Sequence, residues 1–171
     1  SGIATLTRRW VDQVSGTDCL IRDTRKTTPG MRLLEKYAVR MGGGTNHRMS
    51  LSDAALIKDN HIAAAGGVVA AFAQVRAKYP DSPIEIEVDT LEQLQQVLPL
   101  KPDLILLDNM NPEQCAQAVA ITAGRCKLEA SGGISLESAK AYALSGVDYL
   151  AIGALTHSAP VLDIGLDLRV E

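Results

Sequence analysis

Short apolar runs recur along the chain, and each of them ends in polar residues or glycine. We interpret these runs as buried strands over residues 19–21, 54–57, 84–88, 104–107, 127–130 and 149–152. Between the runs, apolar residues return every three or four positions, which predicts helices. Strand therefore alternates with helix, and this order predicts parallel strands joined by right-handed crossovers. The fold class is α/β.

Two architectures are compatible with this alternation, an open doubly wound sheet and a β/α barrel. Both bind ligands at the carboxyl ends of their strands, so the polar residues that end the apolar runs predict where a site lies. Gly132, Gly133 and Gly153 follow the last two predicted strands. Barrels commonly bind phosphate on the loops after late strands, and this pattern therefore favours a barrel.

Length and composition predict one domain that binds small molecules. A chain of 171 residues with 46% hydrophobic content can build one sizeable core. The net charge of −3, without a basic tract interleaved with aromatic residues, argues against a nucleic-acid surface. No apolar stretch is long enough to span a bilayer and the first residues do not resemble a signal peptide, so we expect a cytoplasmic protein without a membrane partner.

The three cysteines carry no predicted chemistry. Cys19, Cys115 and Cys126 form neither a disulfide framework nor a metal-ligand spacing. We expect reduced, buried thiols, because free cysteine behaves as a small hydrophobic residue.

Cationic side chains gather where the early apolar runs end. Arg25 and Lys26 follow the first predicted strand, and Lys58 follows the second. Between them, the triple glycine at residues 42–44 leads to Arg48. These glycines are compatible with a helix stop, and also with a loop that lets the backbone approach a ligand. Cations at strand ends predict an anion-binding site.

Six segments carry a resemblance to one enzyme family. They are residues 23–30, 42–48, 56–61, 85–89, 107–110 and 129–133. In this order they resemble the catalytic domain of quinolinate phosphoribosyltransferase, the decarboxylating enzyme of NAD biosynthesis. The resemblance implies an incomplete, TIM-like β/α barrel of about six or seven parallel strands. It also implies a homodimer that converts quinolinate and phosphoribosyl pyrophosphate, with Mg²⁺, to nicotinate mononucleotide, carbon dioxide and pyrophosphate.

The resemblance assigns the cations to the two adjacent carboxylates of quinolinate. Guanidinium groups suit this dianion because they donate two parallel hydrogen bonds to a carboxylate. Lys26 would meet the pyrophosphate, and Lys58 would contact both substrates. The substrate-binding residues predicted in this part of the chain are Thr24, Arg25, Lys26, His47, Arg48 and Lys58.

Two carboxylates at strand ends are the predicted magnesium ligands. Glu87 and Asp108 end neighbouring predicted strands, where they can hold Mg²⁺ through water and accept hydrogen bonds from ribose hydroxyls. Glu85 and Asp89 flank Glu87, and a period of two places all three on one side. Glu129 has a similar position. The predicted catalytic residues are Lys26, Lys58, Glu87 and Asp108.

Two glycine-containing loops after late strands are predicted to bind the 5′-phosphate. Their exposed backbone N–H groups suit a phosphate ion. The substrate-binding residues predicted in these loops are Ser131, Gly132, Gly133, Ile152, Gly153 and Ala154.

The resemblance also indicates a part that this chain lacks. Family members carry an N-terminal domain, and an arginine of that domain completes the quinolinate site of the partner subunit. Nothing in this sequence matches it. We therefore expect residues 1–161 to form the barrel. Residues 162–171, which alternate like a half-buried strand, are expected to pack on the absent domain.

Three alternative functions remain compatible with the residues. A related enzyme could use nicotinate, although the dense cationic cluster favours a dicarboxylate. The chain could instead be a catalytically silent fragment that only binds anions. A phosphate-binding aldolase or isomerase would need an active lysine or a carboxylate base, and Lys58 would be the candidate lysine.

Overall fold

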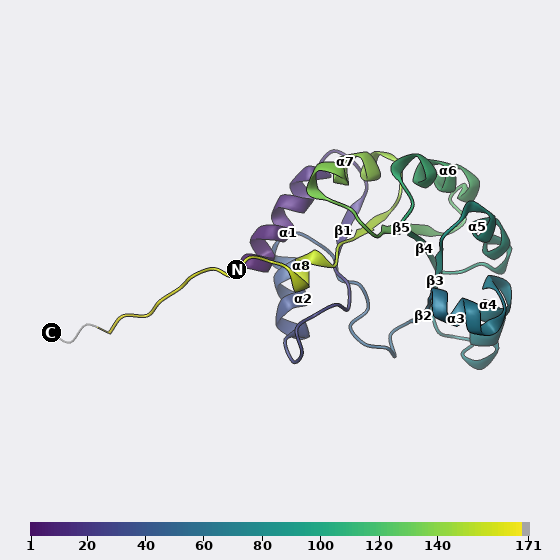
Figure 1. Ribbon diagram of the computed structural model, residues 1–171, viewed down its shortest axis with the longest axis horizontal. Coiled ribbons are helices and arrows are strands. Elements are labelled where there is room, and N and C mark those ends of the chain that lie inside the picture. The colour runs from purple at the N-terminus through teal and green to yellow at the C-terminus, as the bar shows by residue number, and fades with distance from the viewer. Residues whose placement is uncertain (169–171) are drawn as a thin grey trace.

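The computed structural model describes residues 1–168, in which six strands alternate with helices (Figure 1). The elements are α1 (Gly2–Gln13), β1 (Leu20–Arg22), α2 (Arg32–Met41), β2 (Ala55–Ile57), α3 (Asp59–Ala65), α4 (Val68–Lys78), β3 (Ile84–Val88), α5 (Leu91–Val97), the 3₁₀ helix η1 (Leu98–Leu100), β4 (Leu104–Asp108), α6 (Pro112–Thr122), β5 (Lys127–Ser131), α7 (Leu136–Leu144), β6 (Tyr149–Ala151) and α8 (Ala154–His157). The predicted strands agree with the observed ones to within one residue at each end.

The strand order shows that the sheet is an incomplete barrel. The order is β1-β6-β5-β4-β3-β2, and every neighbouring pair is parallel. From β2 to β6 each strand joins the same side of the one before, whereas a doubly wound sheet reverses direction at a switch point. The larger helices lie outside the curved sheet (Figure 1). Within residues 1–168 no ladder of hydrogen bonds joins β1 to β2, so the predicted incomplete barrel is confirmed.

The segment after the triple glycine partly fills the gap between β1 and β2. The Thr45 N–H donates to the Ile21 carbonyl at 2.8 Å, and Thr45 forms an isolated parallel bridge with Arg22. Farther along, the Arg48 guanidinium donates to the carbonyl of Ala54, directly before β2, at 2.7 Å. This segment is therefore held between the two open edges, where it carries His47 and Arg48 to the end of the barrel.

Side chains of the strands alternate between the inside and the outside of the barrel. On β3, Ile84, Ile86 and Val88 belong to the apolar core shared with the outer helices. Glu85 and Glu87 alternate with them and point to the opposite face, as a period of two requires. The main core thus lies between sheet and helices, and the interior near the strand ends is free to be polar.

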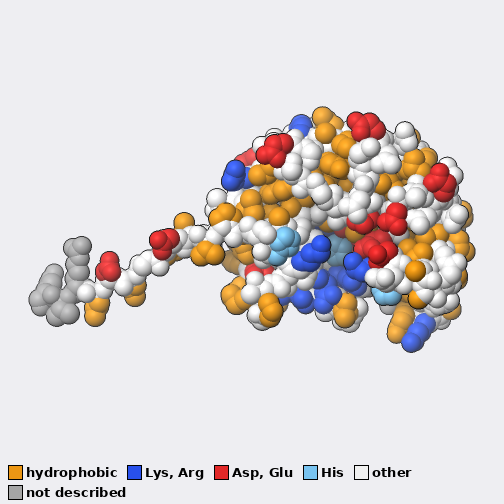
Figure 2. Space-filling view, viewed as in Figure 1, with side chains coloured by type: hydrophobic (Ala, Val, Ile, Leu, Met, Phe, Trp, Pro, Cys, Tyr) orange, Lys and Arg blue, Asp and Glu red, His pale blue; other side chains and the backbone are white. Residues whose placement is uncertain are grey.

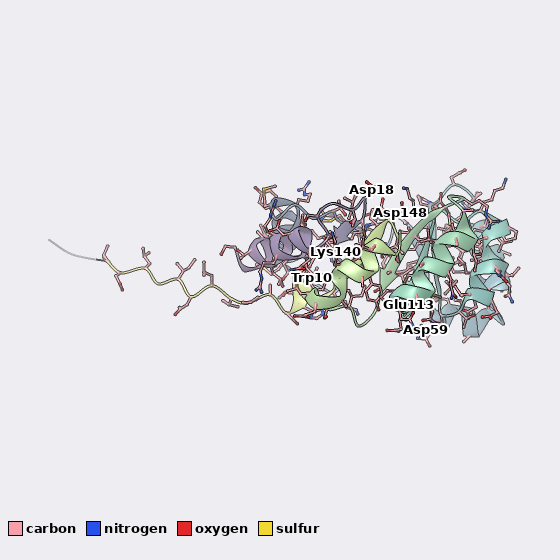
Figure 3. The ribbon with its side chains drawn as sticks, turned by 90° about the horizontal axis from the view of Figure 1, so that it is seen from above. Trp10, Asp18, Asp59, Glu113, Lys140 and Asp148 are labelled. Carbon is pink, nitrogen blue, oxygen red and sulfur yellow. The ribbon has the colours of Figure 1, made fainter. Side chains whose placement is uncertain are left out.

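The amino ends and the carboxyl ends of the strands lie at opposite rims of the barrel (Figure 3). Asp18 and Asp148 precede β1 and β6 and lie along one rim, whereas Asp59 and Glu113 follow β2 and β4 and lie along the other. Because all the strands are parallel, their carboxyl ends meet at the second rim. Residues that follow different strands are thereby brought together.

The triple glycine ends α2 and packs against α1. Gly42 caps the helix directly after Met41. A Cβ atom on Gly44 would lie 2.8 Å from Thr7 Cγ2, and one on Gly42 would lie 2.6 Å from Thr7 Cβ. The predicted helix stop is confirmed. Larger side chains are excluded at Gly42 and Gly44 because the backbone there lies close to α1. Within the described chain, none of the three glycines lines the cavity described below.

The C-terminal segment leaves the barrel after α8 (Figure 1). Residues 161–168 form no strand, and Val161 and Leu166 are 94% and 99% exposed. A strand needs a neighbour for its backbone hydrogen bonds, and the expected neighbour of this segment lies outside the chain, so the predicted packing of this segment stays a prediction. Residues 169–171 of the predicted segment lie outside the described residues.

The helices of the barrel are too short or too polar to span a membrane. No helix within residues 1–168 combines the length and the apolar composition needed to cross a bilayer.

Candidate active site

A cavity of about 690 Å³ opens at the carboxyl ends of the strands. This volume lies within the range of small-molecule sites. Figure 2 shows Lys and Arg side chains gathered near the middle of this face, with Asp and Glu side chains beside them. The cavity brings together every predicted site residue, namely Thr24, Arg25, Lys26, His47, Arg48, Lys58, Glu87, Asp108, Ser131, Gly132, Gly133, Ile152, Gly153 and Ala154.

Two guanidinium groups form the most strongly charged part of the cavity. Burial lowers the pKa of Arg48, and the neighbouring charge of Arg25 lowers it further. Both effects mean that the positive charge is less well stabilised than in water. A bound anion would offset the burial of Arg48 and its repulsion from Arg25, so this pair is suited to a carboxylate.

Two lysines extend the positive charge around the rim. The Lys58 ammonium lies 3.0 Å from Glu87 Oε1 and is half exposed. Lys26 follows β1, and its backbone carbonyl accepts a hydrogen bond from the Thr156 hydroxyl of α8 at 2.6 Å. This contact joins the first strand exit to the last one, so that Lys26 lies beside Gly153.

Carboxylates also line the cavity, among them Glu87 and Asp108. Burial raises the pKa of Asp108, and the negative charge of Asp89 raises it further. Asn109 donates to Asp108 Oδ2 at 2.8 Å and holds it in place. Glu87 lies nearby on β3, paired with Lys58. Glu87 and Asp108 offer the carboxylate oxygens that a hard divalent cation prefers.

The loop after β5 depends on glycine. Gly132 has φ +91°, and a Cβ atom there would lie 2.2 Å from Asn109 Oδ1. The Asn109 N–H also donates to the Ser131 carbonyl at 2.9 Å. The loops after β4 and β5 therefore touch, which places Ser131 and Gly133 next to Asp108 along the cavity wall.

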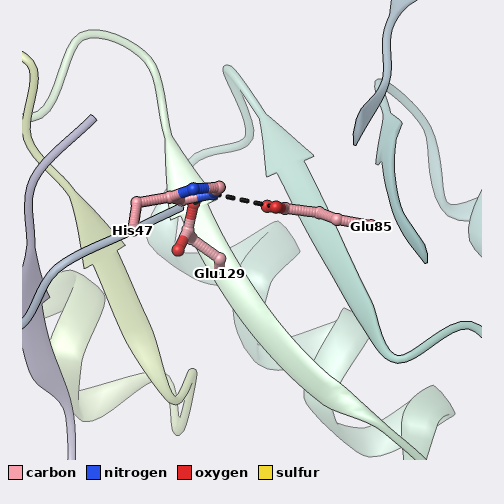
Figure 4. A group of neighbouring side chains, drawn as sticks. All are labelled: His47, Glu85 and Glu129. Carbon is pink, nitrogen blue, oxygen red and sulfur yellow. Dashed lines mark ion pairs between the residues drawn. The ribbon is translucent and has the colours of Figure 1, made fainter. Parts of the chain in front are cut away.

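His47, Glu85 and Glu129 form a buried cluster (Figure 4), and two of them, His47 and Glu129, line the cavity. The His47 Nε2 atom lies 2.8 Å from Glu85 Oε2 and 3.6 Å from Glu129 Oε1. On the other side of the ring, His47 Nδ1 accepts the Arg48 backbone N–H at 2.8 Å. Nδ1 therefore bears no proton, and the imidazole proton lies on Nε2, directed at Glu85.

This protonation pattern changes the predicted role of His47. The sequence predicts that His47 is one of the cations that face quinolinate. In the structure both ring nitrogens are engaged, so His47 would have to release Glu85 before donating to a substrate carboxylate. The same pattern argues against a metal ion in the cluster, because a protonated Nε2 has no lone pair to offer.

The two buried carboxyl groups of the cluster compete for a proton. Burial and the nearby Glu85 raise the pKa of Glu129 to about 7. Within the described chain, Glu85 Oε1 and Glu129 Oε1 have no hydrogen-bond partner. A proton on one of these carboxyl groups removes the repulsion between them.

Sequence reasoning missed the partner of Glu129. Arg22 donates to Glu129 Oε2 at 2.8 Å and stacks on the ring of Tyr149, with 4.4 Å between Cζ and the ring centroid. Asn109 and His157 also line the cavity without having been predicted. The signal for Arg22 was its place at the end of the first strand, next to Arg25.

The fold and the cavity define a β/α-barrel domain whose cavity, at the carboxyl ends of the strands, is lined by both cations and carboxylates and is suited to anions. Residues 3–167 match the family described as quinolinate phosphoribosyl transferase, C-terminal domain. The chain belongs to this family.

Named relatives agree with this assignment. The chain is 61% identical over 171 residues to a carboxylating nicotinate-nucleotide pyrophosphorylase of Mycobacterium leprae, covering 98% of this chain and 60% of the relative. A probable enzyme of the same name from Bacillus subtilis is 48% identical over 172 residues, covering 100% of this chain and 60% of the relative. The crystal structure of the nicotinate-nucleotide pyrophosphorylase of Ehrlichia chaffeensis superimposes with a TM-score of 0.94 at 47% identity, covering 99% of this chain and 62% of that one. The chain therefore spans about 60% of the length of the relatives it matches.

Proposed function

We propose that this chain forms the catalytic barrel of an enzyme that transfers phosphoribose from phosphoribosyl pyrophosphate to quinolinate with decarboxylation. The products are nicotinate mononucleotide, carbon dioxide and pyrophosphate, on a route to NAD. One observation carries the proposal: Arg25, Arg48 and Lys58 all line a single cavity at the carboxyl ends of the strands. Such a concentration of cations suits two adjacent carboxylates better than the single carboxylate of nicotinate.

The walls of the cavity suggest how the two substrates lie. Quinolinate occupies the side of Arg25, His47 and Arg48, while the ribose hydroxyls face Glu87 and Asp108. The 5′-phosphate lies on the glycine loops after β5 and β6, which line the same cavity. The pyrophosphate then lies near Lys26, with Lys58 between the two substrates.

In the proposed reaction the pyridine nitrogen attacks the ribose carbon, and the bond from that carbon to pyrophosphate breaks. The nitrogen has a free lone pair, so no general base is needed. Lys26 and Lys58 stabilise the negative charge that develops on the leaving group. The cationic ring then accepts the electron pair that remains when the neighbouring carboxylate leaves as carbon dioxide, and a proton takes its place.

We propose Mg²⁺ as the cofactor, held by Glu87 and Asp108 together with substrate oxygens. Two features support this: carboxylate oxygens are the ligands that Mg²⁺ prefers, and burial together with the charge of Asp89 raises the pKa of Asp108, so that its carboxylate would gain from a cation. Bound there, Mg²⁺ would neutralise part of the charge of the pyrophosphate.

The assembly and compartment are also proposals. We infer a homodimer or higher homo-oligomer in the cytoplasm, with residues 162–168 packed on another part of the assembly. The exposure of Val161, Ile164, Leu166 and Leu168 supports such packing, because apolar side chains in water favour a covering partner.

Paired substitutions test the reaction. Arg48→Ala or Lys58→Ala should lower the rate of carbon dioxide release by about 100-fold or more, because each removes a charged donor from the cavity. The matched controls Arg40→Ala and Lys78→Ala remove exposed cations from α2 and α4. Lys58→Ala and both controls should unfold near the temperature of the parent, since exposed charges add little stability. Arg48→Ala also loses the hydrogen bond to the Ala54 carbonyl, so its unfolding temperature should fall slightly.

The outcomes separate the alternatives. Near-normal turnover in the Arg48 or Lys58 variant would contradict the site assignment. A parent chain that binds quinolinate but releases no carbon dioxide would favour a silent binding fragment. Borohydride trapping of a carbonyl substrate on Lys58 would favour an aldolase.

A further inference from the structure

Apart from Lys58, the Arg and Lys side chains of the cavity come from two separate loops. Residues 24–28 follow β1 and carry Arg25 and Lys26, whereas residues 45–49 carry His47 and Arg48. A rigid ligand with two fixed negative groups is bound well only if the two loops keep a fixed spacing. The contacts that join the loops therefore bear on ligand affinity.

A buried ion pair fastens the second loop to the end of β1. Asp23 and Lys36 are 0% and 1% exposed, and the Lys36 ammonium donates to Asp23 Oδ1. The same ammonium donates to the His47 carbonyl at 2.9 Å. Asp23 also accepts the His47 backbone N–H at 2.8 Å and the Asn46 side-chain amide at 2.5 Å. Asp23 and Lys36 thus hold both polar groups of the His47 backbone.

The same side of α2 also holds the first loop. Arg32 donates through Nε to the Thr27 hydroxyl at 2.9 Å and through Nη1 to the Met49 carbonyl at 3.4 Å. Glu35 accepts the Thr28 backbone N–H at 3.1 Å. Three residues in the first turns of α2, Arg32, Glu35 and Lys36, therefore contact both cationic loops.

Stability alone is a poor explanation for this ion pair. Burial lowers the pKa of Lys36 in spite of the neighbouring carboxylate of Asp23. Removing two charges from water is costly, and well-packed apolar residues in their place are often equally stable. What apolar residues cannot replace is the set of directional hydrogen bonds to Asn46 and His47.

We propose that Asp23 and Lys36 are positioning residues. They hold the backbone of residues 46–48 against the exit of β1, and so set the spacing between the guanidinium groups of Arg25 and Arg48. The identity of the ligand, a pyridine with two adjacent carboxylates, rests on the proposed function, whereas the position of the loop does not.

The first test measures the loop without any ligand. Asp23→Asn keeps the shape of the side chain but removes its charge, and Lys36→Met removes the ammonium. Each should speed hydrogen exchange at the amides of His47 and Arg48 by about tenfold, while exchange in β4 stays at the parent rate. Val97→Ala, a core change on α5, is the control for general destabilisation. In this variant, hydrogen exchange at the amides of His47 and Arg48 should increase no more than exchange at the amides of β4.

The second test measures affinity by calorimetric titration of the whole chain. Both variants should weaken quinolinate binding by about tenfold or more. Nicotinate, with one carboxylate, should be affected less, because it does not depend on the spacing of two guanidinium groups. Val97→Ala should bind quinolinate like the parent.

A double variant separates positioning from stability. Asp23→Asn with Lys36→Met removes both buried charges, so its unfolding temperature should lie closer to that of the parent than either single variant does. Its loop exchange and its quinolinate affinity should remain impaired. Full recovery of affinity would overturn the proposal, because it would show that charge balance alone was needed.

Three other results would overturn the proposal. They are unchanged exchange at His47 and Arg48 in the single variants, exchange that increases equally throughout the barrel, and unchanged quinolinate affinity. If the parent chain binds no quinolinate, the proposed function fails, and the exchange measurements alone decide the role of Asp23 and Lys36.

Discussion

His47 and Glu129 show how burial changes the contribution of a side chain to the site. The sequence indicates a cation at His47, but its Nδ1 atom accepts the Arg48 N–H and its Nε2 atom faces Glu85. Glu129, at 0% exposure, has a pKa raised to about 7. The buried cluster thus contains a histidine that holds its proton towards Glu85, next to a carboxyl group that gains a proton near neutral pH.

The raised pKa of Glu129 predicts a pH dependence of stability. Folding raises it from 4.5 to about 7, so the folded chain binds this proton more tightly than the unfolded chain does. The contribution of this proton to the stability of the folded chain is complete below pH 4.5 and is lost as the pH rises through about 7. Glu129→Gln mimics the protonated form. Its free energy of unfolding, relative to that of the parent, should therefore increase by on the order of 3 kcal/mol as the pH rises through this range.

Urea unfolding of parent and variant at several pH values between 4 and 8 measures this difference. Glu113→Gln, an exposed change on α6, should show no such trend. A constant difference between the parent and Glu129→Gln would contradict the proposed protonation of Glu129.

At the scale of elements, the contact between α1 and α2 explains why glycine stands at residue 44. The backbone of Gly44 lies against Thr7 of α1 and Val39 of α2. From there the chain turns directly into the segment that runs beside β1. The position of Arg48 therefore depends on how closely these two helices approach.

Gly44→Ala should destabilise the chain by about 1–3 kcal/mol, because the added methyl group overpacks a filled space. Its Cβ atom would lie 2.8 Å from Thr7 Cγ2 and 2.9 Å from Val39 Cγ1. Gly165→Ala, whose Cβ atom meets nothing within 4 Å, is the control. Thermal unfolding compares the two, and equal midpoints would show that the close approach of α1 and α2 is not required.

The strands could be predicted from sequence because their signal is local. Ile84 to Val88 and Leu104 to Leu107 are short apolar or alternating runs with polar exits, and parallel strands covered by helices follow from that pattern. The position of the cavity followed too, since the exits of parallel strands meet at one rim. The family motifs then supplied residues such as Glu87 and Asp108.

The buried partners could not be predicted, because they depend on tertiary register. Arg22 and Glu129 are 107 residues apart, and only the pairing of both β1 and β5 with β6 brings them together. Asp23 and Lys36 meet because α2 folds back over the exit of β1. The alternation in the segment after α8 is also local, but its expected partner is not among the described residues, so that prediction stays open.

At the scale of the whole molecule, the apolar core between sheet and helices encloses two of the three cysteines. Cys19 and Cys115 are buried, and burial raises the pKa of their thiols to about 12 and about 11. Since the thiolate is the reactive form, both thiols should be inert while the chain is folded. Cys126 is only partly buried.

Alkylation with iodoacetamide at pH 8, followed by mass spectrometry, should therefore modify Cys126 first. Cys19 and Cys115 should react at the same rate, which is set by global unfolding of the chain. Urea should accelerate the alkylation of both cysteines equally. Rapid reaction of Cys115 in the folded chain would contradict a cooperative core around α6.

The group of cations in the cavity is the feature on which the substrate assignment depends, and binding tests it most directly. Calorimetric titrations of this chain with quinolinate and with nicotinate, in the same buffer with the same magnesium concentration, compare a dianion with a monoanion. We predict that quinolinate binds more tightly, because Arg25, Arg48 and Lys58 lie in one cavity. Equal or tighter binding of nicotinate, or no binding of quinolinate, would contradict the claim that the cations of this chain select a dicarboxylate.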